Sequence, residues 1–157
     1  MKKMLITGLF ASLICACGGS SNEKKEVPPA PAETAAAPSA NAESTDKGVG
    51  KFTNVEVGAT LDVKMAELGS KIYDVKCGSC HKLTGERLVG PGWKGVTGRR
   101  RPEWIMNFVT NVDEMLDKDA LAQSQLEVCL VRMPNQNLTD DDARHVYEFM
   151  RKNDGIK

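Results

Sequence analysis

Apolar residues in the C-terminal two-thirds of the chain recur at intervals of three and four positions. No stretch between residues 52 and 157 alternates convincingly between apolar and polar residues, so the pattern predicts helices and argues against a sheet. The first helix is predicted to begin near Asp62. Its apolar residues are expected to share one face: Met65, Leu68, Ile72 and Val75.

Two more helices are predicted in the middle of this region. Pro102 and Glu103 suit the first turn of a helix, because proline needs no backbone donor there and a carboxylate favours the positive end. The residues expected to face inward are Trp104, Ile105, Phe108 and Val109. The next helix is predicted from about Asp119, with a stripe formed by Ala122, Leu126, Cys129 and Leu130.

The last predicted helix has the clearest start and stop signals. Thr139 can cap it and Leu138 can pack as a hydrophobic staple, while acidic residues 140–142 lie at its positive end. Arg151 and Lys152 lie near its negative end. Its inner face is predicted to be Ala143, Val146, Tyr147 and Met150.

The N-terminus has the pattern of an export signal. Two lysines precede an apolar run, residues 4–14, that is too short to span a bilayer as a stable helix. The end of this run resembles a bacterial lipobox, in which the small Ala16 precedes Cys17, the residue expected to be lipidated. The signal peptide is then residues 1–16. An ordinary secretory signal, leaving a soluble periplasmic protein, is the alternative.

Residues 17–51 form a Pro-, Ala- and Ser-rich stretch with too few large apolar residues to bury. We expect a disordered linker there, followed by one folded domain at residues 52–157. Gly18, in place of aspartate after the lipidated cysteine, favours the outer membrane by resemblance to enterobacterial sorting rules.

Composition excludes some classes of function. The 157 residues have a formal net charge of zero, so bulk charge gives no reason to expect nucleic acid as a partner. Five cysteines are present, and two of them lie in the signal region. A disulfide framework is therefore not expected.

The sequence Cys77-Gly78-Ser79-Cys80-His81 has the spacing of a c-type haem attachment site. Each thiol can add to one vinyl group of the same porphyrin edge, and the histidine that follows can reach the iron. Thiol exchange and zinc binding also use C-x-x-C. However, an amphipathic helix rather than a buried strand precedes Cys77, and no second ligand pair is spaced for zinc.

Met133 is the best candidate for the second axial ligand of such an iron. It follows a predicted helix, and Pro134 favours an extended backbone suited to presenting a side chain from a loop. Thioether ligation favours reduced iron and is typical of electron carriers. Met115 is a weaker rival, and His145, the only other histidine, is expected beside the inner face of the last helix. The other methionines of the domain lie on helical stripes: Met65, Met106 and Met150.

From about Asp62 to Asn153 the chain resembles the class I, mitochondrial-like monohaem cytochromes c. Gly69 and Tyr73 precede the Cys-x-x-Cys-His motif as a glycine and an aromatic do in that family, and Met133 matches its distal methionine. The resemblance implies three to five helices wrapped around one covalent haem c. It implies that Gly69 lets the first helix approach the last one closely. It also implies that the carbonyl of Pro91 accepts a hydrogen bond from His81.

Together these features predict a membrane-tethered electron carrier with no substrate turnover. Its partners would be a redox donor and an acceptor, such as a respiratory complex and a terminal reductase, and we expect a monomer facing the periplasm. The alternative is a five-coordinate haem protein that acts as a gas sensor or a peroxidase-like enzyme.

Two charged clusters are candidates for docking surfaces. The basic cluster is Lys94, Arg99, Arg100 and Arg101, and the acidic cluster is Asp113, Glu114, Asp117 and Asp119. Such patches can steer association. For the arginines, contact with haem propionates is an equally good interpretation, and either Trp93 or Trp104 could also reach a propionate.

Overall fold

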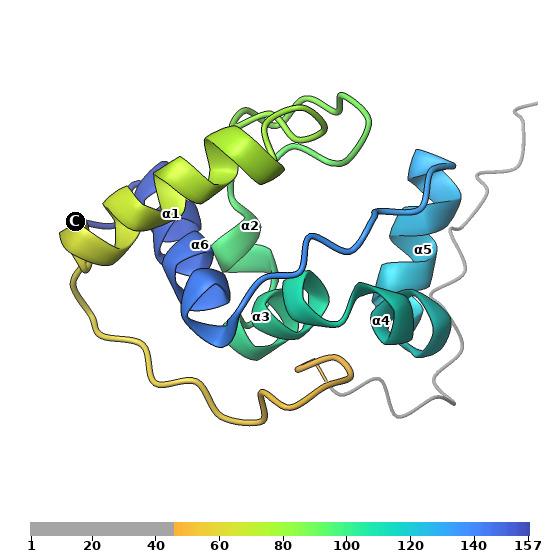
Figure 1. Cartoon of the computed structure of the whole chain (residues 1–157), viewed down its shortest axis with the longest axis horizontal. Helices are drawn as coiled ribbons and strands as arrows, with labels where there is room; N and C mark the ends of the chain where they lie inside the picture. The colour runs from red at the N-terminus through yellow and green to blue at the C-terminus, as the bar shows by residue number, and fades with distance from the viewer. Residues whose placement is uncertain (1–45) are drawn as a thin grey trace, which may run out of the picture. The chain divides into compact units, whose positions relative to one another are not determined.

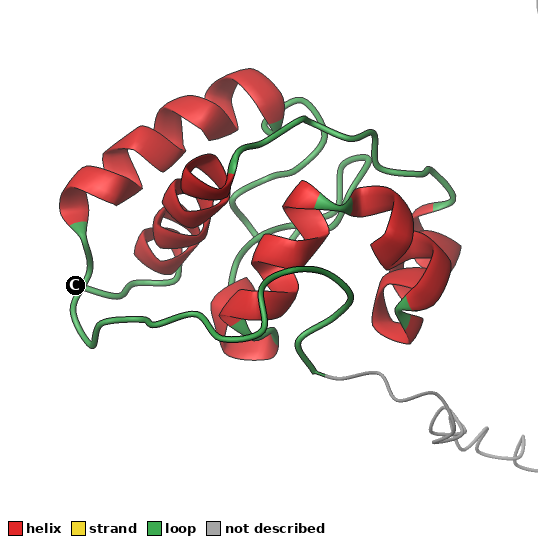
Figure 2. Cartoon of the chain, turned by 60° about the horizontal axis from the view of Figure 1, so that its bottom comes forward, coloured by secondary structure: helices red, strands yellow, loops and turns green. Residues whose placement is uncertain are grey.

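A computed structural model describes residues 46–157 of the chain, and helices account for the regular structure of this part (Figure 1). The helices are α1 (Val63–Lys76), α2 (Val96–Arg99), α3 (Pro102–Thr110), α4 (Val112–Lys118), α5 (Ala120–Cys129) and α6 (Asp140–Asn153). No strand forms within residues 46–157, as Figure 2 shows by colour. The predicted all-α class is confirmed. The described part has six helices rather than the three to five expected, and the two short ones, α2 and α4, have no clear signal in the sequence.

Helices α1 and α6 form the main helix pair and cross at Gly69 (Figure 1). A Cβ atom at Gly69 would lie 2.0 Å from the carbonyl oxygen of His145 and 2.8 Å from Cβ of Phe149. Only a residue without a side chain allows this approach. The close helix crossing expected from the resemblance is therefore present.

The buried face of α1 differs from the predicted one. Ala66 and Gly69 are buried, whereas Leu68 is 37% and Val75 is 83% exposed. The close crossing selects small residues for the interface, and the larger side chains of the predicted stripe do not all fit there. Leu130 is a second correction, because it ends α5 in a left-handed conformation and is 85% exposed.

Helix α6 forms as predicted. Thr139 and Asp142 make a reciprocal capping box, in which each side chain accepts a hydrogen bond from the backbone N–H of the other residue. The predicted inner face is buried throughout: Ala143, Val146, Tyr147 and Met150.

Helices α3, α4 and α5 follow one another with very short connections. Trp104 of α3 is 5% exposed, and its indole N–H donates to Asp119 Oδ1 at 3.0 Å. The same oxygen accepts from the N–H of Ala122 and so caps α5. Asp119 is 1% exposed, which removes it from the predicted acidic surface cluster.

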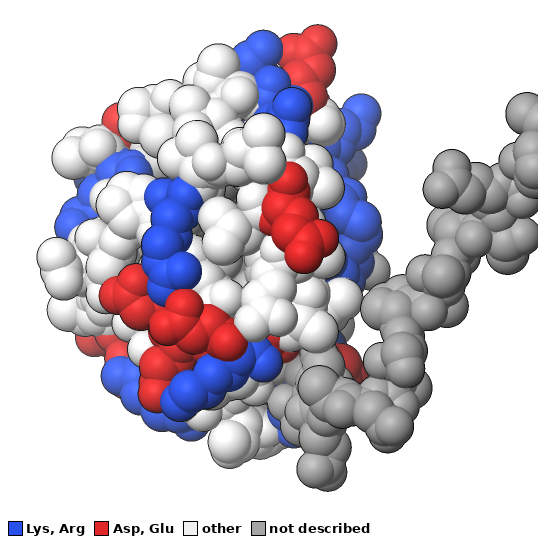
Figure 3. Space-filling model, turned by 90° about the vertical axis from the view of Figure 1, so that its right-hand side faces the viewer, with Lys and Arg blue, Asp and Glu red and all other residues white. Residues whose placement is uncertain are grey.

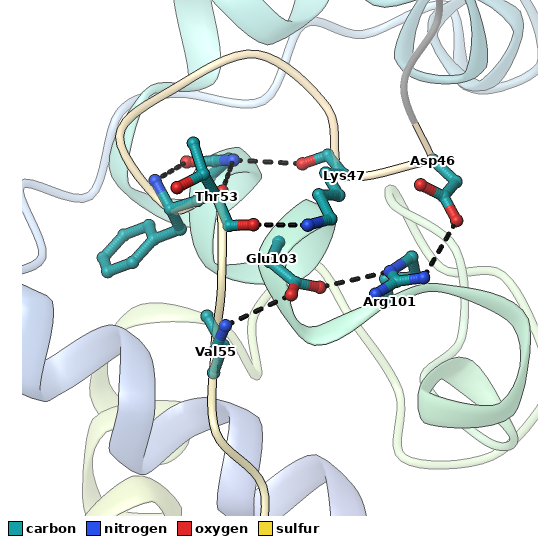
Figure 4. Close-up of polar contacts among 8 residues, drawn as sticks. Asp46, Lys47, Thr53, Val55, Arg101 and Glu103 are labelled. Carbon is teal, nitrogen blue, oxygen red and sulfur yellow. Dashed lines mark hydrogen bonds and ion pairs between the residues drawn. The ribbon is translucent and has the colours of Figure 1, made fainter.

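The segment 46–57 packs along α3 (Figure 4). Asn107 donates to the carbonyl oxygens of Lys47 and Phe52 and accepts from the N–H of Phe52. Glu103 accepts from the N–H of Val55 at 3.1 Å. The folded part therefore begins before Phe52, and residues 46–51, assigned to the linker from their composition, belong to it.

The signal peptide, Cys17 and most of the predicted linker lie outside the described residues. Within residues 46–157, no helix has the length and apolar character needed to cross a membrane.

Candidate haem site

The Cys77–His81 turn continues directly from the last turn of α1. The N–H groups of Cys77 and Gly78 both donate to the carbonyl of Tyr73, and the N–H groups of Cys80 and His81 donate to the carbonyl of Cys77. The Tyr73 hydroxyl donates to the carbonyl of His81 at 2.6 Å. Tyr73 therefore fixes both ends of the turn, which is a structural reason for an aromatic residue four positions before the motif.

The two thiols of the motif are free, as is Cys129. Burial raises the pKa of the Cys77 thiol to about 11. A nucleophile for thiol exchange needs the opposite shift, because the thiolate is the reactive form. Among residues 46–157, no group of three or more His, Cys, Asp or Glu side chains is placed to hold a metal ion. Neither result supports the thiol-exchange or zinc interpretation.

His81 is held by a hydrogen bond to the carbonyl of Pro91, with Nδ1 and O 2.9 Å apart. A carbonyl can only accept, so Nδ1 carries the proton and Nε2 is left with a lone pair for a metal. Burial lowers the pKa of His81, which favours the neutral form that binds iron. A Cβ at Gly90 would lie 2.3 Å from Cε1 of the ring, so the loop can approach His81 only with glycine there.

Two cavities meet beside His81. The first cavity lies between Cys80, the loop 89–91, α5 and the segment 131–134. The second reaches Trp93, α3, and Arg99 and Arg100 at the end of α2. The residues that line both cavities are His81, Pro91, Phe108, Gln125 and Met133.

Met133 is the methionine that lines both cavities together with His81. Met115 is fully buried in α4 and its Sδ accepts a hydrogen bond from the N–H of Val49 at 3.0 Å, so it does not line either cavity. Met150 lines only the second cavity and stays within the α6 core. His145 lines neither cavity. The structure therefore separates Met133 from its rivals.

The second cavity contains a buried donor without a partner. Arg100 Nε is shielded from solvent and has no hydrogen-bond partner, while its guanidinium lies 5.1 Å from the ring centroid of Trp104. Arg99 lines the same cavity. An unpaired buried donor is costly unless a ligand satisfies it. The propionate carboxylates of a haem are such a ligand, and their charge suits this end of the cavity.

Trp104 already donates to Asp119, so its N–H is not available to a propionate. Trp93 lies beside His81, with ring centroids 5.8 Å apart, and packs edge-on against Tyr73. Of the two tryptophans, Trp93 is the one next to the proximal histidine.

A family comparison agrees with this site. The family model described as "Cytochrome c" matches residues 66–154, which is more than half of the chain. The chain belongs to the cytochrome c family. Members of this family carry covalently attached haem c, one per chain, and are in general electron carriers.

Solved structures give the same result. A cytochrome c from Rhodothermus marinus is 28% identical, with a TM-score of 0.65 over 67% of this chain and 90% of that chain. An engineered form of it, Rma TDE, has the same identity and coverage and a TM-score of 0.64. The same engineered protein bound to a carbene intermediate (1-ethoxy-1-oxopropan-2-ylidene) gives 0.61. No curated protein sequence matches this cytochrome.

Several residues of the site were not predicted from the sequence. Phe108 was expected to be in the core, but its exposure to the haem cavities was not foreseen, and neither was the lining role of Gln125. Cys129, expected as a small buried apolar residue, is half-buried and lines the first cavity. No local motif marks such positions, because they are brought to the cavity by the packing of α3 and α5.

Most side chains of the two predicted charged clusters have partners within the domain or line a cavity. In the basic cluster, Arg101 pairs with Asp46 and Glu103, while Arg99 and Arg100 line the second cavity. The remaining acidic residues pair with nearby bases: Asp113 and Asp117 with Arg132, and Glu114 with Lys118.

Proposed function

We propose that this cytochrome c is a membrane-tethered carrier that passes single electrons between respiratory proteins outside the cytoplasm. The observation that carries the proposal is that His81 and Met133 line the same two cavities, with Cys80 on the wall and Cys77 one turn away. Bound haem c supplies an iron that alternates between ferric and ferrous states. Cys77 and Cys80 would hold it through thioether bonds, with His81 and Met133 as axial ligands.

The protein's own groups suit electron transfer better than catalysis. The hydrogen bond from His81 to Pro91 fixes the ring and its tautomer, and a thioether from Met133 favours the reduced iron. Apolar residues supply most of the wall around Met133 and limit the entry of water. His81 and Met133 would together supply both axial ligands and would leave no coordination position open to a substrate.

Arg99 and Arg100, which line the second cavity, would neutralise the haem propionates there. The unpaired Nε of Arg100 gains its missing acceptor in this arrangement, and the Trp104 ring supports the guanidinium from one face. We therefore prefer the propionate role for these two arginines over a docking role.

The location is inferred from the N-terminal sequence, and the redox partners are inferred from the cytochrome c family. Both belong to the proposal. A lipid on Cys17 would anchor the chain to a periplasm-facing membrane, with the outer membrane favoured by Gly18. A redox donor and a redox acceptor, such as a respiratory complex and a terminal reductase, would meet a monomeric carrier there. Incorporation of labelled fatty acid into wild type and Cys17→Ala tests the anchor: only the wild type should be labelled. Equal labelling would refute lipidation at this residue.

Carbon monoxide binding separates an electron carrier from a five-coordinate haem protein. The ferrous wild type should titrate reversibly with one electron per chain and show little binding of carbon monoxide, because Met133 occupies the sixth position. Met133→Ala should bind it readily. Rapid binding by the wild type, unchanged in the variant, would favour the gas-sensor or peroxidase-like alternative.

A further inference from the structure

The segment that carries Met133 has little structure of its own. Residues 130–139 join α5 to α6 without a helix or strand, and no backbone–backbone hydrogen bond involves residues 131–138. The two non-glycine residues with positive φ in the described part, Leu130 and Asn137, lie in this segment. Apart from those of Arg132, the side-chain hydrogen bonds of residues 130–138 are local: the Gln136 amide donates to the carbonyl of Pro134, and Asn135 Oδ1 accepts from the N–H of Asn137. Other parts of the protein must therefore hold Met133 in place.

Two cationic side chains attach the segment to neighbouring helices. Arg132, directly before Met133, places Nη2 2.8 Å from Asp117 Oδ1 and 3.4 Å from Asp113 Oδ1 on α4. The same nitrogen lies 3.3 Å from the Asp113 carbonyl oxygen. On the other side of Met133, Lys76 at the end of α1 donates to the carbonyl of Gln136 at 2.7 Å.

The Arg132 contacts lie on the solvent-facing side of the domain. Figure 3 views the side of the domain that bears α5, and basic and acidic side chains adjoin on that face. The Arg132 side chain is 43% exposed, and those of Asp113 and Asp117 are 69% and 61% exposed. Dissolved salt can therefore screen these pairs.

We propose that Arg132 is a positioning residue for the distal ligand: its contacts with Asp113 and Asp117 hold the segment against α4 and keep Met133 in the haem cavity. This rests on the proposed function, in which Met133 binds the iron. When the contacts break, the segment can move away and the sixth position becomes accessible to a small external base. Because the pairs are exposed, Met133 leaves more often as ionic strength rises.

The exchange of Met133 for imidazole on the ferric holoprotein measures this release. At saturating imidazole, the exchange rate equals the rate at which Met133 leaves the iron. Arg132→Gln should raise that rate about fivefold at low salt, the factor expected when about 1 kcal/mol of exposed ion pairing is lost. Asp117→Asn should change it in the same direction. The wild-type rate should rise with salt and approach the Arg132→Gln rate, which should itself change little.

Lys118→Gln is the matched control. It also removes one positive charge, here from α4, and breaks a similar exposed pair, Lys118 with Glu114, that does not touch the segment. Its exchange rate and salt dependence should equal those of the wild type. The thermal midpoint of Arg132→Gln should fall by only about 4 °C, the shift that matches the loss of the same ~1 kcal/mol, so the variant stays folded in the assay.

Equal rates for Arg132→Gln and wild type at low salt would overturn the proposal. So would a rise of the same size in Lys118→Gln, which would indicate a general effect of surface charge. Failure of the proposed function is recognised separately. In that case the ferric spectra of wild type and Met133→Ala are identical before imidazole is added, and no methionine is available to be displaced.

Discussion

The α1–α6 crossing allows a sharp test of the fold through Gly69→Ala. The added Cβ would lie 2.0 Å from the carbonyl oxygen of His145 and 2.6 Å from its carbonyl carbon. Both atoms belong to the backbone of α6, so no side chain can rotate away. The two helices must separate, and the core residues between them lose contact.

The size of the effect follows from two opposing contributions. Overpacking costs about 1–3 kcal/mol, and an overlap with backbone belongs at the upper end of that range. Replacing glycine by alanine inside a helix returns up to about 1 kcal/mol. We expect a net destabilisation of about 2 kcal/mol. For a domain of this size the thermal midpoint should fall by roughly 8 °C or more.

Gly98→Ala provides the matched control for this experiment. Gly98 also lies in a helix, α2, but a Cβ there would have no atom within 4 Å. This variant should be as stable as the wild type or slightly more stable. Denaturant unfolding of the holoproteins gives both free energies. If Gly69→Ala is as stable as Gly98→Ala, the close helix crossing described above is wrong.

Three further predictions concern the surroundings of the haem cavities and the last helix. Asp119→Ala should lower the free energy of unfolding by roughly 2–4 kcal/mol, because it removes a helix cap and leaves the Trp104 N–H buried without an acceptor. Denaturant unfolding should show a much smaller loss for Asp119→Asn, and equal losses in the two variants would refute this reasoning. Gly90→Ala should displace His81 and weaken its hydrogen bond to Pro91. The reduction potential of the holoprotein should then rise by about 40 mV, the equivalent of about 1 kcal/mol. An unchanged potential in spectroelectrochemistry would contradict this prediction. The capping hydrogen bonds lower the pKa of Asp142. Its contribution to stability is therefore present above the ordinary carboxyl range and is lost as the pH falls through the lowered pKa. Asp142→Asn should reduce the loss of unfolding free energy with falling pH, and an unchanged pH dependence would exclude this contribution.

The elements with strong local signals could be predicted from the sequence. Helix α6 has a capping box at Thr139, an apolar stripe and charges that suit both ends, and it forms within the expected bounds. The Cys77–His81 motif forms a turn at the end of α1, as its short spacing predicts. The hydrogen bond between His81 and Pro91, which the family resemblance implies, is also present.

The remaining features depend on tertiary contacts that leave no local pattern. Helix α1 buries Ala66 and Gly69 against α6, whereas the pattern of large apolar residues predicted Leu68 and Val75 on the buried face. Segment 46–51 is rich in glycine and polar residues and resembles a linker, but it is held through backbone groups: the carbonyl of Lys47 accepts from Asn107, and the N–H of Val49 donates to Met115 Sδ. Likewise, no sequence pattern indicates that Arg100 Nε is buried without a hydrogen-bond partner, because its surroundings come from several elements of the fold.

The ferric absorption spectrum of the purified holoprotein tests the central claim most directly. A haem iron bound by a methionine sulfur has a weak charge-transfer band at the red end of the visible range. We expect this band in the wild type and in Met115→Leu, and its loss in Met133→Ala with the haem still covalently attached. A wild type without the band, or a Met133→Ala variant that keeps it, would contradict the assignment of His81 and Met133 as the axial ligands.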